Sequence, residues 1–216
     1  MTSTPNHRPT PEKEEAPSVS IAEIRRALAR LPAKADHAPA EIRHAAVAMV
    51  FAGDPEAPEL CFIRRAEREG DPWSGQMAFP GGKADPEDAG LREAAERETM
   101  EEVGLRLRDS HYLAALAHSP VRSGGVETGM RLFPFVYYLG EERPPLTPNG
   151  EVAEAFWVPL SHILDLRNNV EMPLRRNGEL LKFPSVRYRG RHIWGVTYRV
   201  LVQFTTAISR PLADAL

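Results

Sequence analysis

Residues 79–106 read FPGGKADPEDAGLREAAERETMEEVGLR, and this stretch predicts a glycine-containing entry followed by one helix. Good helix formers fill residues 89–103, and Gly104 stands just past them, where a left-handed C-cap is favoured. At about 100° per residue, one broad arc of the helix carries the side chains that we expect to face a core. These side chains are Leu91, Ala94, Ala95, Thr99 and Val103.

Two acidic residues fall inside this arc. Glu98 and Glu102 lie in its middle, whereas Arg92, Glu93 and Glu96 lie toward the opposite side. Two carboxylates about 5 to 6 Å apart on a semi-buried face repel by roughly 3 kcal/mol at an effective dielectric of ~20. A hard divalent cation would remove this cost, and Mg²⁺ binds one or two carboxylates while it keeps its waters and shares phosphate oxygens. The pattern favours a metal site over the other interpretation, a solvated acidic helix.

The run RETMEEVGL, residues 97–105, resembles the Nudix box, whose pattern is Gly, five residues, Glu, seven residues, then Arg-Glu-U-x-Glu-Glu-x-Gly-U with U apolar. The matching residues are Arg97, Glu98, Glu101, Glu102, Gly104 and Leu105, and Thr99 matches the first U weakly. Where the family pattern has its first Glu, this chain has Ala89, with Asp88 beside it and Gly82 one place early. The longer spacing, with Asp in the acidic position, resembles the coenzyme A pyrophosphatase branch of the family.

The similarity to this branch covers about residues 44–208. It is carried by Arg65-Ala66, Gly75-Gln76, residues 79–82, the Ser123-Gly124 loop, Ile193-Trp194-Gly195 and Thr197. The chain departs from the branch upstream of the box. Cys61-Phe62-Ile63 replace Leu-Leu-Thr, Gly70 replaces a second arginine, and residues 71–74 replace a basic segment. These departures bear on the choice of substrate more than on the chemistry.

The resemblance implies an α/β fold, a Nudix-type α/β/α sandwich around a mixed β-sheet. It also implies hydrolysis of a diphosphate bond with Mg²⁺ or Mn²⁺ bound by Glu98 and Glu102, with Glu101 close by. The ion would neutralise the diphosphate and lower the pKa of a bound water. Arg97 would orient the glutamates, and Gly81–Gly82 would let the backbone approach the substrate.

The substrate that we expect is coenzyme A or an acyl-coenzyme A. NADH, ADP-ribose and nucleoside triphosphates are the alternatives, and a non-catalytic nucleotide-sensing protein is an alternative of another class. The sequence has no G-x-S-x-G elbow, no H-E-x-x-H motif and no P-loop, so a protease or esterase is disfavoured.

Length, net charge and cysteine count limit the kinds of fold, partner and metal site that the chain can have. With 216 residues, 42% of them apolar and 26% charged, the chain can build one good-sized core. A net charge of -3 gives no general attraction to nucleic acid or to an anionic membrane. Cys61 is the only cysteine, which excludes an intrachain disulfide and a cysteine-rich metal site. The longest apolar run, residues 45–52, is too short to span a bilayer, so we expect a cytoplasmic protein.

Three segments are expected along the chain. Residues 1–17 predict a disordered tail, residues 18–40 a short helix and linker, and residues 41–216 the catalytic domain. Apolar residues at helical spacing follow Ser20, a plausible N-cap. This helix would cover part of the core; the alternative is a substrate-side contact or a contact in a homodimer.

Residues 44–51 and 59–65 predict a hairpin. At its end, one of Arg64 and Arg65 would point outward and the other, which we take to be Arg65, toward phosphate. Trp73 is expected to be a packing anchor, and residues 75–79 a short strand.

Further strands are expected at residues 111–117 and 130–139, separated by a loop over residues 119–127. In this loop Ser123 could contact substrate, although an exposed turn is the other interpretation. Residues 151–160 predict a strand in which Glu151 or Glu154 could supply a metal ligand or general base. Ser161 would cap a helix, residues 183–188 and 192–194 would form a hairpin, and residues 195–209 would be a helix or strand.

Overall fold

The computed structural model describes residues 18–32, 43–176 and 178–212. The predicted tail and most of the predicted linker, residues 33–40, lie outside this range. The described helices are α1 (Ile21–Leu28), α2 (Leu91–Val103), α3 (Leu160–Leu164) and α4 (Gly195–Ala207), with short 3-10 turns at Asp109–His111 and Leu166–Asn168. The strands of the larger sheet are β1 (Arg43–Ala52), β2 (Glu59–Arg65), β3 (Met77–Ala78), β4 (Gly81–Lys83), β5 (Tyr112–Ala115), β6 (Ser119–Ser123), β7 (Val126–Tyr138) and β8 (Val152–Pro159).

The larger sheet is mixed. Its main order is β3-β2-β1-β7-β5, with β4 paired to β1, β6 to β7 and β8 to β2. The pair of β1 and β7 is parallel, and the other pairs are antiparallel. The predicted hairpin of β1 and β2 exists only beside its turn, at Phe51↔Leu60 and Ala52↔Glu59. Strand β1 instead pairs with β7 along nearly its whole length. This central position in the sheet leaves β1 buried from Ala45 onward.

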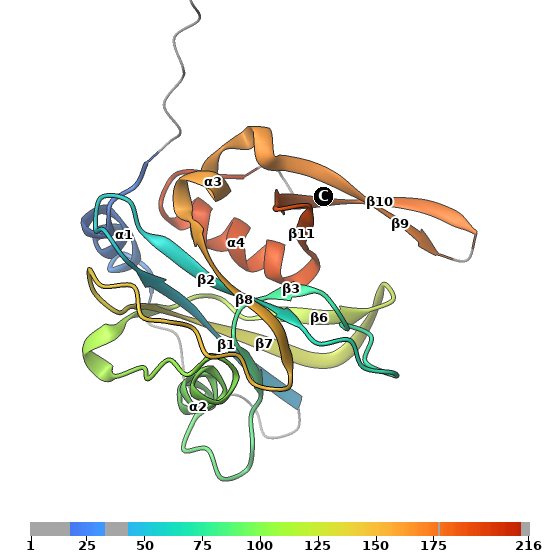
Figure 1. The fold of residues 1–216 in the computed structure, drawn as a ribbon, viewed down its shortest axis with the longest axis horizontal. Coiled ribbons are helices and arrows are strands. Elements are labelled where there is room, and N and C mark those ends of the chain that lie inside the picture. Colours follow the sequence, from blue (N-terminus) through green and yellow to red (C-terminus); the bar gives the residue numbers. More distant parts are fainter. Residues whose placement is uncertain (1–17, 33–42, 177, 213–216) are drawn as a thin grey trace, which may run out of the picture.

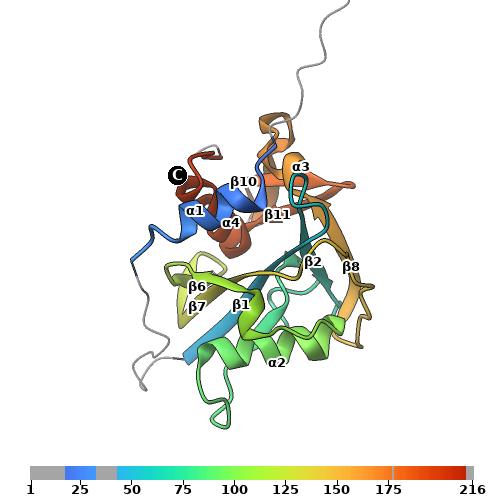
Figure 2. The ribbon, with the colours of Figure 1, turned by 90° about the vertical axis from the view of Figure 1, so that its left-hand side faces the viewer.

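Alternate residues of β1 build two separate cores. Ala46, Ala48 and Val50 pack on the side of α2, while Met49 and Phe51 pack on the side of α1 and α4. Figure 2 shows α2 on one face of the sheet and α1 and α4 on the other. The predicted α/β/α sandwich around a mixed sheet is therefore confirmed (Figure 1).

Helix α1 forms where its apolar spacing predicts it. The Ser20 side chain accepts a hydrogen bond from the backbone N–H of Glu23, and the Glu23 carboxylate accepts one from the backbone N–H of Ser20. This capping box fixes the start of the helix. Ile21, Ile24 and Leu28 are buried, so α1 covers part of the core, as expected.

The segment over residues 119–127 was predicted to be a loop, and this is wrong. Strands β6 and β7 form a hairpin there, closed by Gly124 and Gly125, whose φ values are 60° and 81°. Positive φ at both central residues is the geometry of the two-residue turns that suit hairpins. The outer end of β7 is mostly exposed, so its sequence carries no apolar alternation that would have indicated a strand.

The C-terminal part adds a second, three-stranded sheet in the order β11-β10-β9, formed by β9 (Asn169–Arg176), β10 (Glu179–Tyr188) and β11 (Arg191–Trp194). The hairpin predicted at residues 183–188 and 192–194 is confirmed, and β9 was not predicted. Helix α3 begins at Leu160 with Pro159 at its N-cap position, so the predicted cap at Ser161 is wrong. Residues 195–207 are a helix. None of the helices in the described ranges is long and apolar enough to cross a membrane.

Candidate active site

Helix α2 presents the arc that its sequence predicts. Leu91, Ala94, Ala95, Thr99 and Val103 are all buried. Its C-cap is Gly104 in the left-handed conformation, with φ 74°. Glu102 shares the buried face and is only 2% exposed, while the Glu98 side chain is 16% exposed. Two carboxylates thus lie on the inward side of the helix, one turn apart.

Both carboxylates lie against strand β4. The backbone N–H of Gly81 donates a hydrogen bond of 2.8 Å to Glu102. A Cβ added to Gly82 would come within 2.5 Å of the Glu98 carboxylate carbon, and one added to Gly81 would come within 2.2 Å of the Ala46 carbonyl oxygen. The two glycines are therefore required by close packing on a strand, not by the turn that a glycine pair usually indicates.

The electrostatics of the two carboxylates are unfavourable as they stand. Burial raises the pKa of Glu102 to about 7, and the nearby charges of Glu98 and Glu151 add to this, against the Gly81 hydrogen bond and Arg65. Burial also raises the pKa of Glu98, although Arg97 opposes the change. Added positive charge at this place would stabilise both ionised groups.

Arg97 joins helix α2 to the loop that precedes it. Its Nε and Nη2 donate to the two oxygens of Asp88 at 2.9 and 3.1 Å, and the Asp88 side chain is only 6% exposed. Its Nη1 donates to Glu98 at 3.2 Å and to Glu101 at 3.3 Å. These contacts are the ones that an orienting role for Arg97 requires. They also show what the acidic residue beside Ala89 does: its carboxylate holds the guanidinium.

Glu101 occupies a different position from its two neighbours. Its side chain is 55% exposed and lies beside Arg97, outside the lining of the cavity described below. Its proposed role as a metal ligand stays a prediction.

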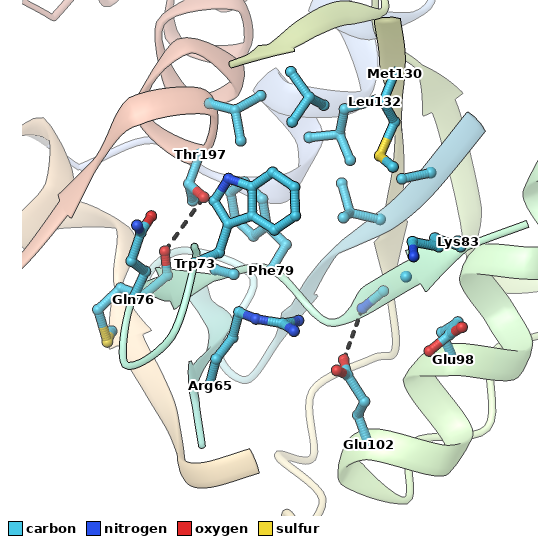
Figure 3. Close-up of a pocket in the computed structure, with 18 of the residues that line it drawn as sticks. Arg65, Trp73, Gln76, Phe79, Lys83, Glu98, Glu102, Met130, Leu132 and Thr197 are labelled. Atoms are coloured by element: carbon cyan, nitrogen blue, oxygen red, sulfur yellow. Dashed lines mark hydrogen bonds between the residues drawn. The ribbon is translucent and has the colours of Figure 1, made fainter. Parts of the chain in front are cut away.

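A cavity of about 330 Å³ opens next to the carboxylates. Glu98, Glu102, Glu151, Arg65 and Lys83 form its charged part. Its other walls are largely apolar and include Val47, Trp73, Phe79, Val121, Met130, Leu132 and Val196. Figure 3 shows Glu98 and Glu102 on the side of α2, with Met130, Leu132 and Thr197 across the cavity from Glu102.

The two arginines at the end of β2 diverge. Arg65 lines the cavity, where its Nη2 donates to Asp71 at 2.9 Å and its buried Nε has no partner in the described residues. Arg64 instead donates to Glu154 at 3.0 Å, and neither of these lines the cavity. Asp71 also accepts a hydrogen bond from the backbone N–H of Trp73. One carboxylate therefore fixes two parts of the cavity wall.

Of the other residues expected at the site, one lines the cavity and two do not. Glu151 lines the cavity, although its carboxylate is paired with Arg68 at 2.8 Å, whereas Glu154 is paired with Arg64 and Arg191. Ser123 pairs with Val126 at the end of a hairpin and does not line the cavity, so its contact with substrate stays a prediction.

Two residues of the cavity region were not selected from the sequence. Lys83 follows the glycine pair on β4, and the alternation of that strand places it on the same face as Gly81. This placement depends on β4, a strand that was not predicted. Asp71 offered no signal in the sequence, because its importance depends on contacts with Arg65 and Trp73 that only the folded loop creates.

The donor set was compared with what a divalent ion needs. No group of three or more His, Cys, Asp or Glu side chains in the described residues is arranged to hold a metal. Mg²⁺, however, takes one or two protein carboxylates and completes its shell with water and phosphate oxygens. Glu98 and Glu102, both destabilised as anions by burial, fit this requirement.

Comparisons with known proteins agree with this geometry. Residues 42–176 match the NUDIX domain. The chain is 34% identical over 167 residues to the Nudix hydrolase NudL of Yersinia pestis (strain Pestoides F), covering 77% of this chain and 80% of that protein. NudL of Yersinia pseudotuberculosis serotype O:1b (strain IP 31758) gives the same values. A crystal structure of a MutT/nudix family protein from Enterococcus faecalis superposes with a TM-score of 0.51 at 15% identity, covering 88% of this chain and 70% of that one, which shows a shared fold.

Proposed function

This chain belongs to the Nudix hydrolases, pyrophosphohydrolases that act on nucleotide derivatives, and from this premise we propose that its substrate is coenzyme A or an acyl-coenzyme A. The products would be 3′,5′-ADP and a phosphopantetheine. The observation that carries the proposal is the placement of Glu98 and Glu102 against Gly81–Gly82, at the charged end of a cavity whose remaining walls are largely apolar.

Glu98 and Glu102 are the residues that would hold Mg²⁺ or Mn²⁺, and Glu101 is the candidate for a third carboxylate. When bound, such an ion supplies charge neutralisation for a diphosphate and lowers the pKa of a coordinated water. Arg97 keeps the glutamates in position through its contacts with Asp88, Glu98 and Glu101.

The remaining steps belong to other side chains of the cavity. Arg65 and Lys83 would bind phosphate oxygens, since both residues line the same cavity as the carboxylates. Water adds to phosphorus, the bridging P–O bond breaks, and a carboxylate accepts the proton from the water. Glu151 is the candidate for this base because it lines the cavity and Glu154 does not.

The cavity lining supports this substrate class. Three carboxylates and two cationic side chains contribute to it, so a polyphosphate chain would meet little positive charge from the protein beyond its ions. The apolar walls around Trp73 and Phe79 suit an uncharged arm attached to the diphosphate, which would leave the walls around Val121 and Val196 for the nucleoside. Both features favour a coenzyme A derivative over a nucleoside triphosphate.

A substrate panel tests the proposal. The protein is incubated with Mg²⁺ or Mn²⁺ and coenzyme A, acyl-coenzyme A, NADH, ADP-ribose or a nucleoside triphosphate, and products are identified by mass. We expect 3′,5′-ADP and a phosphopantetheine to accumulate fastest. Faster cleavage of another member would overturn the coenzyme A assignment, and tight binding without turnover of any member would indicate a nucleotide sensor.

Substitution of the carboxylates tests the site. Glu98→Gln and Glu102→Gln should each lower turnover by at least ~100-fold while the protein stays folded, because each removes a charge needed to stabilise the reacting phosphate through the ion. Glu101→Gln should lose less, because Glu101 lies outside the cavity lining. Glu87→Gln, at an exposed position of the preceding loop, is the matched control. Wild-type turnover in either of the first two variants would disprove the assignment.

A further inference from the structure

Three arginines from different elements gather at the β6–β7 hairpin, outside the site described above. Arg122 comes from β6, Arg176 from the end of β9 and Arg199 from α4. Glu127 is the one carboxylate that the described salt bridges place among them, and it pairs with Arg122 at 3.1 Å. The cluster therefore carries more positive charge than its own carboxylate compensates.

Arg199 is held by a backbone carbonyl and not by a salt bridge. Its Nη2 donates to the Pro120 carbonyl oxygen at 2.7 Å, and its buried Nε has no partner in the described residues. It forms no salt bridge within that part of the chain. Burial, and the neighbouring charge of Arg122, lower its pKa, although the charge of Glu127 opposes the change. An oriented, half-buried guanidinium that makes no ion pair of its own is suited to binding an anion.

Arg176 lies on the backbone of the hairpin turn. A Cβ added to Gly124 would come within 2.9 Å of its Nη2, and one added to Gly125 within 2.8 Å of its Nη1. The glycine pair thus leaves room for the guanidinium as well as closing the turn. Arg176 likewise has no salt bridge among the described residues, and Ser123 immediately precedes the turn.

The arginines border the apolar end of the cavity. None of the three arginines lines the cavity itself, but Arg199 lies beside its wall. Val196, which lines the cavity, comes just under one helical turn before Arg199, and the Pro120 carbonyl that Arg199 binds directly precedes Val121, which also lines it. Figure 3 shows Thr197, at the start of the same helix, across the cavity from Glu102. A substrate whose diphosphate lies at the carboxylates would therefore extend toward the arginines.

We propose that Arg176 and Arg199, with Arg122 and the Ser123 hydroxyl beside them, bind a phosphate monoester that the substrate carries on its nucleoside, away from the diphosphate. A phosphate monoester is a dianion with three terminal oxygens, and guanidinium groups bind such oxygens in pairs. The inference rests on the proposed function and adds to it a second anchoring point. It gives the β6–β7 hairpin a role in substrate choice.

The test compares substrates that differ only in that phosphate. The value of kcat/KM is measured for coenzyme A against dephospho-coenzyme A, and for NADPH against NADH, so that a 3′-phosphate and a 2′-phosphate are examined separately. In the wild-type protein, kcat/KM should be roughly ten-fold higher for the phosphorylated member of at least one pair. Arg199→Gln or Arg176→Gln should bring this ratio of kcat/KM values close to one. Arg175→Gln, on the exposed face of β9 opposite Arg176, should keep it.

The outcomes separate the two proposals. Equal turnover of both members of each pair by the wild-type protein, or an unchanged preference in both arginine variants, would overturn the phosphate site while diphosphate hydrolysis stands. Cleavage of none of the four compounds would instead contradict the proposed substrate class. In that case, binding of 3′,5′-ADP no tighter than of 5′-AMP, measured calorimetrically, would overturn the phosphate site as well, and tighter binding that Arg199→Gln abolishes would support it.

Discussion

The two ends of the cavity are built in different ways. At its charged end, the carboxylate pair that we call the acidic end comes from one short stretch, in which β4 and α2 bring Gly81, Glu98 and Glu102 together across a single loop. Its apolar end is assembled from β1, β6, β7, α4 and the loop between β2 and β3. The first end is a local structure that a sequence motif can specify. The second depends on how distant elements pack, so it can change between related chains without altering the chemistry.

The largest effect should come from disturbing the acidic end by one methyl group. In Gly82→Ala, the new Cβ would meet the Glu98 carboxylate at 2.5 Å, and this flexible side chain would have to move. A displacement of about 1 Å at a reacting group can cost ~100-fold, so we expect turnover to fall by that order with little change in Tm.

Gly150→Ala is the matched control, because no heavy atom lies within 4 Å of its added Cβ. Wild-type turnover in Gly82→Ala would show that the acidic end tolerates movement, and the contrast between the two ends would fail.

The second effect is the pH dependence of ion binding at the same end. Below about pH 7 Glu102 holds a proton that a bound ion must displace, so the apparent Kd for Mg²⁺ should rise by up to ~10-fold per pH unit as the pH falls. Without the ion, folding raises the pKa of this carboxyl from 4.5 to about 7. Its contribution to stability is therefore present below pH 4.5 and is lost as the pH rises through about 7.

The increase of Tm on adding MgCl₂, measured at pH 6 and at pH 8, checks this prediction. The increase should be larger at pH 8, and Glu102→Gln should remove most of the difference. An equal increase at both pH values in the wild-type protein would contradict the assignment of Glu102 as a ligand.

Away from the acidic end the expected effect is smaller and of another kind. Asp71→Asn should weaken the ion pair that holds Arg65 and leave the contact with the backbone of Trp73 less favourable. We expect KM to rise about 3- to 10-fold with kcat within about two-fold, since binding and not the reacting group is disturbed. Steady-state kinetics with the preferred substrate measure both values.

Asp54→Asn is a suitable control, because Asp54 accepts an equivalent backbone hydrogen bond, from Glu56, in the β1–β2 turn. A fall in kcat without a change in KM would place Asp71 with the acidic end and so remove the distinction.

The smallest effect concerns stability. Asp88→Asn should lower the free energy of unfolding by about 1 kcal/mol, because the buried carboxylate binds Arg97 through two hydrogen bonds. Asp85→Asn should change it by less than ~0.5 kcal/mol, because Asp85 is 62% exposed and lies 3.4 Å from the same guanidinium. Urea denaturation of the two variants compares them directly, and equal losses would contradict the assigned role of Asp88.

The sequence predicted most of what is local. The buried arc of α2, its C-cap at Gly104 and the cap of α1 at Ser20 follow from helical spacing and end residues, and the structure confirms them. The sandwich and its mixed sheet were expected from the family resemblance. Glu98 and Glu102 lie together because a helix places residues four apart on one face.

What was missed depends on distant contacts. The hairpin of β6 and β7 was taken for a loop, since its outer end is exposed and has no apolar alternation. Strand β9 is an edge strand containing Pro173, a residue that argues against a strand when the partner is unknown. Lys83 lies on β4, a strand that was not predicted, and Asp71 acquires its role only from the folded loop.

The parallel pairing of β1 with β7 also bears on how the protein is made. Arg43, at the start of β1, donates a hydrogen bond to the carbonyl oxygen of Thr128, 85 residues further along the chain. Because closing so long a loop costs entropy before any contact compensates it, this pairing is expected to form late and slowly. On the ribosome, α2 emerges before β7, so its two inward carboxylates are made before the strand that completes the sheet. Because Glu151 and Val196 of the same cavity are made later still, activity should appear only after residue 196 has been synthesised and β1 has paired with β7.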